Sequence, residues 1–185
     1  MDAREFLDTA RDPIEWFDKA DELRTSGDVL WECYASKRNG ASDIDEYRRM
    51  AAYTTSVMVY AMAIEAALKG RLLRQDPNRI RFSFETNGVG EVQSASIKQF
   101  AVGSHNLEAL AESVGLIAKD RNNERREVLR RLTECLVWVS RYPVPKAVSN
   151  DQKARSVVPI VYHNRTIREY VDEMLNELLE DYDGK

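Results

Sequence analysis

The segment VMVYAMAIEAALKGRLL, residues 57–73, decides the fold of this chain. Its apolar side chains recur at three- and four-residue steps, which is the spacing of one face of an α-helix, and the pattern extends back to residue 43. We therefore predict a helix over about 43–74, with Asp43 and Glu46 at the spacing of a capping box. Two apolar stripes run along it, so we expect a central helix with neighbours on several sides. The longer stripe consists of Ile44, Tyr47, Ala51, Thr54, Met58, Met62, Glu65, Leu68 and Leu72.

An apolar pattern with a strong start signal precedes this helix. Asp12-Pro13 supplies an N-cap residue and a proline in the first helical turn. Gly27 interrupts the apolar pattern that follows. We therefore predict two short helices, or one kinked helix, over 13–36.

Three more helices are predicted after the central one. Ser104 is the best N-cap for a short helix that Gly115 ends. An Arg-rich helix is expected over about 122–140. The last helix starts at Thr166, because a glutamate stands three residues later at capping-box spacing.

Two segments break the helical pattern. Residues 79–93 alternate apolar and polar side chains around an Asn87-Gly88 turn signal, which predicts a small β-hairpin. Residues 143–163 contain several prolines and predict a long loop. The predicted fold class is therefore all-α: an up-down helical bundle of five or six helices with a small β-hairpin insertion and one long loop.

The composition is that of one globular domain. The chain has 185 residues, of which 43% are hydrophobic and 31% charged. We expect a single domain over 1–185, with N-terminal helices in 1–42, the bundle core in 43–146, and the long loop and C-terminal helix in 147–185. A chain of this length buries a sizeable core without needing a disulfide or a metal.

The net charge of −4 conceals a strong polarity along the chain. Residues 1–36 carry a net charge of −6, residues 119–168 carry +7 and residues 169–185 carry −6. Two interpretations follow. The acidic ends neutralise the basic segment inside the fold, or the basic segment forms an anion-binding face, for instance for nucleic acid.

Several classes of protein are not indicated. The first residues lack the apolar core of a signal peptide, and we see no run of about 18 apolar residues that predicts a membrane span. Cys33 and Cys135 both fall on predicted apolar helix faces, which favours reduced, buried thiols in a cytoplasmic protein. With only His105 and His163 in the chain and no phosphate-binding loop, we predict neither a metal site nor a cofactor.

Glu65 and Lys69 are the charged pair inside the apolar segment 57–73. A carboxylate at that depth must be paired or hydrogen-bonded. One interpretation is a salt bridge between residues four apart, on the wetter edge of the helix. The other is that Glu65 holds a basic group from another helix, such as Arg141.

Arg141 and His105 are the other candidates for chemistry. Arg141 ends the Arg-rich helix, where the helix dipole favours a cation, and its aromatic neighbours suit it to orient a carboxylate or a phosphate. His105 stands near a helix start, so it is either a neutral capping or hydrogen-bonding side chain or a group that transfers protons.

Three motifs in order carry a family resemblance: AIEAALK at 63–69, SHNLEAL at 104–110 and WVSRYPVP at 138–145. The set resembles the HEPN-like proteins of prokaryotes, in which a Glu/Lys helix precedes a His-Asx-Leu helix start and an Arg-Tyr-Pro helix end. The resemblance covers roughly residues 43–146. It implies a helical up-down bundle that commonly dimerises.

Many HEPN-like proteins are ribonucleases of toxin–antitoxin, abortive-infection and defence systems, and others bind nucleotides or act as partners of nucleotidyltransferases. The family ribonucleases carry an arginine followed by a histidine four to six residues later. In this chain positions 146–148 are Lys, Ala and Val, and no arginine has a histidine at that spacing. The resemblance therefore implies the scaffold, while His105 and Arg141 match positions of the subfamily's pattern.

These observations support three hypotheses. The first is a non-catalytic, dimerising HEPN-like module that binds a partner protein, RNA or a nucleotide in a defence or stress system. The second is a metal-independent ribonuclease with an atypical site, in which His105 is the general acid or base and Arg141 stabilises the phosphate. The third is a purely structural dimer without an anion site. The residues predicted to bind the ligand are Glu65, Lys69, Arg126, Arg130 and Lys146.

Overall fold

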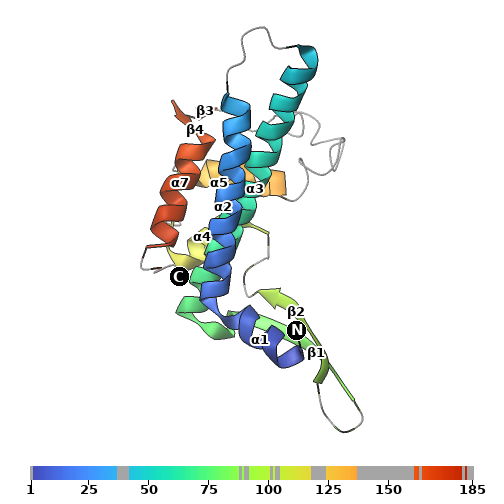
Figure 1. Cartoon of the computed structure of the whole chain (residues 1–185). Helices are drawn as coiled ribbons and strands as arrows, with labels where there is room; N and C mark the ends of the chain where they lie inside the picture. The colour runs from blue at the N-terminus through green and yellow to red at the C-terminus, as the bar shows by residue number, and fades with distance from the viewer. Residues whose placement is uncertain are drawn as a thin grey trace, which may run out of the picture.

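The structure is a computed structural model that describes residues 2–36, 42–87, 89, 92–100, 102, 105–117, 124–136, 161–162, 164–180 and 182. The described residues are mostly helical, with six α-helices and two small two-stranded antiparallel sheets (Figure 1). The helices are α1 (Ala3–Arg11), α2 (Pro13–Ala35), α3 (Asp43–Gln75), α4 (Leu107–Val114), α5 (Glu124–Glu134) and α7 (Ile167–Leu178). The predicted all-α character and the hairpin are thus confirmed.

The predicted central helix exists as α3, and its start differs by one residue from the expectation. Ser42 is the N-cap, and it exchanges hydrogen bonds with Asp45 in a capping box. The expected pairing of Asp43 with Glu46 is replaced, because Ser42 offers a hydroxyl in the position before the first turn. Most residues between Tyr53 and Leu73 are buried, so the C-terminal part of α3 forms the centre of the core.

The length and composition of α3 also suit a membrane span. One 18-residue window within Asp43–Gln75 has a mean hydropathy of 1.3, and 61% of that window is buried inside the fold. The core helix of a folded domain has the same composition, and α3 packs against α2, α4 and α7 in this way.

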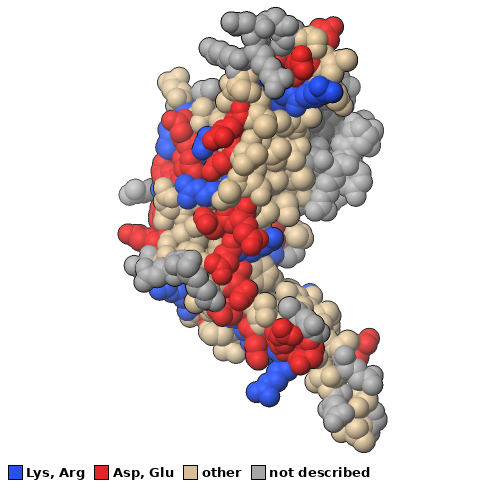
Figure 2. Space-filling model, in the orientation of Figure 1, with Lys and Arg blue, Asp and Glu red and all other residues tan. Residues whose placement is uncertain are grey.

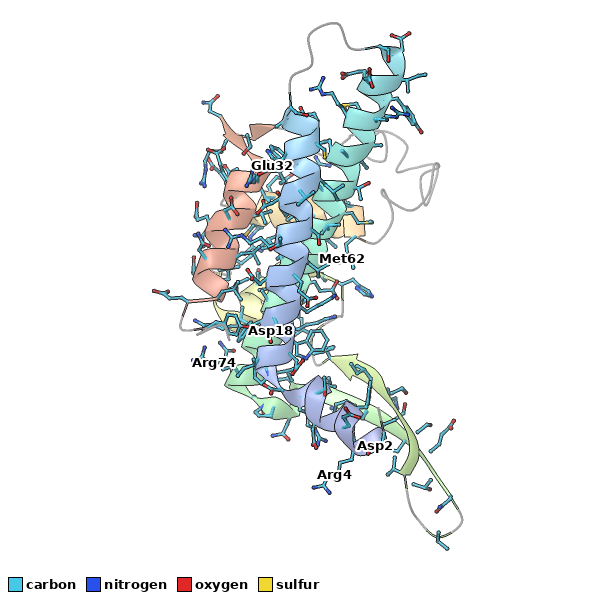
Figure 3. The ribbon with its side chains drawn as sticks, in the orientation of Figure 1. Asp2, Arg4, Asp18, Glu32, Met62 and Arg74 are labelled. Atoms are coloured by element: carbon cyan, nitrogen blue, oxygen red, sulfur yellow. The ribbon has the colours of Figure 1, made fainter. Side chains whose placement is uncertain are left out.

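The segment 13–36 forms one continuous helix, α2, rather than two short helices. Asp12 caps it as predicted, accepting a hydrogen bond from the Ile14 amide at 2.9 Å. Gly27 does not break the helix. It lies against the ring of Tyr60 on α3, so the absence of a side chain allows the two helices to approach closely. Figures 1 and 3 show α2 and α3 side by side, with Asp18 and Glu32 near opposite ends of α2.

Helix α1 has no counterpart among the predictions. Asp2 and Glu5 form a capping box at its start, and Ala10 at its end is buried. The ring of Phe6 on α1 contacts the ring of Phe82 edge-on, with the two centroids 6.3 Å apart. The helix is short and has few apolar residues, so its apolar contacts become visible only in the folded chain.

The hairpin is longer than predicted. Strands β1 (Ile80–Thr86) and β2 (Val92–Phe100) pair antiparallel, following the short 3-10 helix η1 (Pro77–Arg79). Ile80 and Phe100 pair at the buried base, while the far part projects away from the helices (Figure 1). A second, minimal sheet joins β3 (Val161–Tyr162) to β4 (Arg165–Thr166) just before α7.

The later helices follow the predictions with one change of cap. Asn106, not Ser104, caps α4, accepting a hydrogen bond from the Ala109 amide; Ser104 lies outside the described residues. Gly115 ends α4 in the left-handed region, at φ 82°, as its position predicted. Thr166 and the predicted glutamate form the capping box of α7.

The two cysteines differ in their surroundings. Cys135 is buried, as predicted, whereas Cys33 is exposed near the end of α2, so the prediction of a buried thiol there is wrong. The apolar pattern of α2 suggested a buried position, but α3 covers the neighbouring face, which carries Trp31. Neither cysteine forms a disulfide.

Replacing Gly27 with alanine tests the close approach of α2 and α3. A Cβ at this position would lie 2.5 Å from the fully buried Tyr60 ring, whose hydroxyl is held by Asp28. Helix propensity favours Ala by about 0.5–1 kcal/mol, while overpacking costs about 1–3 kcal/mol, so we expect net destabilisation. Urea denaturation measures it, with the exposed neighbour Ser26→Ala as control. A Gly27→Ala protein as stable as the wild type would contradict this packing.

Candidate functional site

Glu65, Lys69 and His105 form a polar cluster at the edge of the core, hereafter the Glu65 cluster. Glu65 and Lys69 stand on successive turns of α3, and the Lys69 ammonium donates a hydrogen bond to the Glu65 carboxylate. His105 Nδ1 lies 3.2 Å from Oε1 of the same carboxylate. The predicted pairing of residues four apart is confirmed, but not its place on a wetter edge. Both residues are only 8% exposed.

Aromatic rings surround the Lys69 ammonium. Its Nζ lies 4.7 Å from the ring centroid of Phe100 and 5.5 Å from that of Trp16. The two rings meet edge-on at 5.3 Å, and Trp16 Nε1 donates a hydrogen bond to the Ala10 carbonyl. A cation over ring faces gains electrostatic attraction where water is excluded. The ion pair thus joins the end of β2 and the start of α2 to α3.

His105 occupies the open side of the cluster. Its side chain is 59% exposed, in contrast to the buried pair. Asn106 supplies the cap of α4, so His105 is not the capping side chain, whereas the hydrogen-bonding role predicted as the alternative to capping is confirmed by its contact with Glu65. Because Nδ1 faces Glu65, the carboxylate fixes the orientation of the imidazole, which is the arrangement that orients a histidine for proton transfer.

The arginines of α5 that were predicted to bind a ligand are paired within the fold. Arg126 Nη1 lies 2.5 Å from carboxylate oxygens of both Glu108 and Glu112, and its side chain is only 12% exposed. Arg130 is 52% exposed and pairs with Glu108 and Glu127. Partial burial opposes ionisation of Glu108, but hydrogen bonds from both arginines outweigh it and lower its pKa.

Helix α7 neutralises the other side of α5. Arg125 lies 2.5 Å from Glu173 and 2.7 Å from Glu177, and Arg165 lies 2.6 Å from Glu173. Hydrogen bonds from Arg125 and then Arg165 lower the pKa of Glu173. Internal neutralisation, one of the two interpretations of the charge pattern, therefore holds for these arginines. Two of the partners, Glu108 and Glu112, come from α4 and not from the acidic ends of the chain.

The N-terminal acidic segment meets α7 instead of α5. Arg168 Nε lies 3.1 Å from Asp28, and Arg24 lies 2.8 Å from Asp172. Asp28 also accepts a hydrogen bond from the buried Tyr60 hydroxyl at 2.8 Å. Burial, and then this hydrogen bond, raise the pKa of Tyr60. This network connects α2, α3 and α7, so it is part of the scaffold.

Two predicted site residues, Arg141 and Lys146, lie outside the described residues. The structure therefore brings together three of the seven predicted residues, Glu65, Lys69 and His105. It places Arg126 and Arg130 in a separate cluster on α5. Among the described residues, no group of three or more His, Cys, Asp or Glu side chains is arranged to hold a metal ion. The aromatic partners Trp16 and Phe100 were missed, since no motif marks them.

No protein-family model matches the chain, and neither the search of curated proteins nor that of solved structures found a match.

Breaking the buried pair from each side tests the Glu65 cluster. Glu65→Gln leaves the Lys69 ammonium buried without a carboxylate, which we expect to cost about 3–5 kcal/mol of unfolding free energy. Lys69→Met should cost less, because Glu65 keeps His105. The double variant should recover part of the loss, since it removes both charges. Chemical denaturation of the three variants measures this; equal single losses or simple additivity would count against the arrangement.

Acid unfolding tests the pairing of α5 with α7. The lowered pKa of Glu173 contributes stability above the ordinary glutamate value of 4.5, and this contribution is lost as the pH falls through the lowered pKa. Glu173→Gln should therefore be less stable than the wild type at neutral pH and should lose less on acidification. Glu180→Gln is the matched control, because Glu180 is exposed on the turn after α7. Parallel pH profiles for wild type and Glu173→Gln would contradict the expectation.

Proposed function

We propose that this protein is a non-catalytic, HEPN-like helical module that forms homodimers and binds a partner protein in the cytoplasm, within a defence or stress system. The observation that carries the choice of ligand is the neutralisation of α5. Arg125, Arg126 and Arg130 each pair with two carboxylates, so their charges serve the fold. The antiparallel course of α2 and α3 in Figure 1 supports an up-down bundle.

The charge of the visible surface also favours a protein ligand. RNA and nucleotides are bound by faces on which arginine and lysine gather without acidic neighbours. Figure 2 shows Asp and Glu side chains along α2, with Lys and Arg interspersed among them. An RNA phosphate backbone would meet repulsion over this face.

Large apolar side chains are exposed on the hairpin and on the first turns of α3, among other positions. Phe84 (49% exposed) and Val92 lie on the projecting part of the hairpin, and Ile44 and Tyr47 lie on the first turns of α3. Exposed apolar patches of this kind mark interaction sites between proteins. A module with a neutralised α5 and apolar patches suits protein partners better than nucleic acid.

Hydrodynamic and binding measurements on the whole chain test this proposal. We expect sedimentation equilibrium to give a homodimer at micromolar concentration. Fluorescence anisotropy with a single-stranded RNA should show weak binding, and Arg130→Ala should leave it unchanged because Arg130 is paired. Tight RNA binding that weakens steeply with salt, and weakens further in Arg130→Ala, would favour the RNA-binding form of the module. A wild-type protein that sediments as a monomer would overturn the proposed homodimer.

One observation favours the ribonuclease as a second candidate. The carboxylate of Glu65 orients the exposed His105, which is what a general acid or base requires. In that case Arg141 would stabilise the phosphate in the transition state. The Glu65–Lys69 pair by itself also suits a purely structural role, as in the structural dimer.

An RNA-degradation assay separates these candidates. Removing a general acid or base lowers the rate by roughly 100- to 10,000-fold, so the ribonuclease requires that His105→Ala and Arg141→Ala abolish cleavage. For the non-catalytic module we expect the same background cleavage in the wild type and both variants. A large loss in both variants, with the fold intact by circular dichroism, would establish the second candidate instead.

A further inference from the structure

A cavity of about 340 Å³ lies between α1 and the first turns of α2, and we call it the α1–α2 pocket. One face of each helix contributes to it, and the lining residues are Phe6, Thr9, Ala10, Glu15, Trp16 and Lys19. This volume is at the lower end of the range of about 300–1,000 Å³ that ligand pockets span. The pocket therefore suits one bulky group and not the face of a whole helix.

Contacts with the rest of the fold hold the walls of the α1–α2 pocket in place. Trp16 Nε1 donates a hydrogen bond to the Ala10 carbonyl at 3.0 Å, which ties the start of α2 to the end of α1. The Trp16 ring also meets the Phe100 ring edge-on at 5.3 Å, and the Phe6 ring meets a ring of β1 in the same way. Because both aromatic walls are already fixed, binding requires little ordering of the protein.

The charge around the α1–α2 pocket is negative. Lys19, the basic residue of its lining, is paired with Glu22 at 2.9 Å. Glu15 has no ion-pair partner among the described residues. The cation at the end of α1, Arg11, lies over a ring of the hairpin, 5.0 Å from its centroid. Figure 2 shows Asp and Glu side chains gathered where α1 meets α2, so an apolar pocket stands within an acidic surface.

We propose that the α1–α2 pocket receives an aromatic side chain of a partner protein, from a segment that also carries lysine or arginine. The aromatic group would pack against the Phe6 and Trp16 rings, and a few buried aromatic anchors of this kind carry most of the binding energy at protein interfaces. A basic neighbour in the segment would pair with Glu15. A second copy of this chain fits poorly, because a two-fold contact would bring the same carboxylates face to face.

This inference rests on the proposed protein-binding module and adds the chemistry of its partner. Fluorescence anisotropy of the whole chain with labelled peptides tests it, and the probe is the peptide KKFKKG. We expect KKAKKG to bind at least about tenfold more weakly, because it lacks the aromatic anchor. The peptide EEFEEG should not bind, since its carboxylates would be repelled.

Variants of the chain separate the pocket from a general effect of charge. Glu15→Lys should weaken binding of KKFKKG at least about tenfold. Glu32→Lys is the matched control, because it makes the same change of charge near the other end of α2 (Figure 3). Glu32 is about 25 Å further along the helix, well beyond the screening length of about 8 Å at physiological ionic strength, so this variant should bind like the wild type.

A third variant tests the cavity and not its charge. Thr9→Phe places a ring in the pocket and should weaken binding of KKFKKG about as much as Glu15→Lys does. Circular dichroism establishes that each variant is folded. Binding of KKFKKG that is unchanged in Thr9→Phe would overturn the pocket as the binding site.

The other outcomes distinguish this inference from the proposed function. No binding of KKFKKG at millimolar concentration, or equal losses in Glu15→Lys and Glu32→Lys, would overturn the pocket and leave the protein-binding module standing. Tight, salt-sensitive binding of single-stranded RNA in a parallel titration would overturn the module itself. Free phenethylamine that binds as tightly as KKFKKG would show a small-molecule site, and loss of the dimer in Glu15→Lys would show a second copy in the pocket; either result would overturn the partner segment.

Discussion

The buried ion pair between Glu65 and Lys69 is the constraint on which the surrounding structure depends. Neither charge can be left unpaired at 8% exposure, so the segments beside α3 must supply groups that tolerate or stabilise them. Trp16 and Phe100 give the ammonium two ring faces, and His105 gives the carboxylate a second partner. One pair of charges thereby holds the first turns of α2, the end of the hairpin and the segment before α4 against α3.

The sequence predicted the elements of the fold well because local signals set them. Periodicity and capping residues located α3, α7 and the start of α2, and these signals act within a few residues of the chain. The number of helices in 13–36 was undecided, because Gly27 has two roles that look alike in sequence. It can break a helix, or it can admit a ring such as that of Tyr60, and only tertiary contact decides.

The candidate site was predictable in part for the same reason. The Glu65–Lys69 contact follows from a spacing of four within one helix, whereas the contact with His105 joins residues 40 positions apart. The segment charges indicated that the arginines of α5 could be neutralised. They could not show that Glu108 and Glu112 would do so, because these belong to a segment whose net charge is only +1. Segment sums hide the alternation of charges along a helix face.

The Glu65 cluster and the exposed residues Ile44 and Tyr47 belong to one apolar stripe of α3. From Met62 onward the stripe is closed by the chain's own residues, which approach because Glu65 and Lys69 require partners. Before Met62 the stripe holds no charge, so no polar requirement draws the described segments over it, and Ile44 and Tyr47 are exposed. Exposed apolar area of this kind is lowered in free energy by association. A single charged pair thus divides α3 into a half that organises the fold and a half whose apolar stripe the described residues leave exposed.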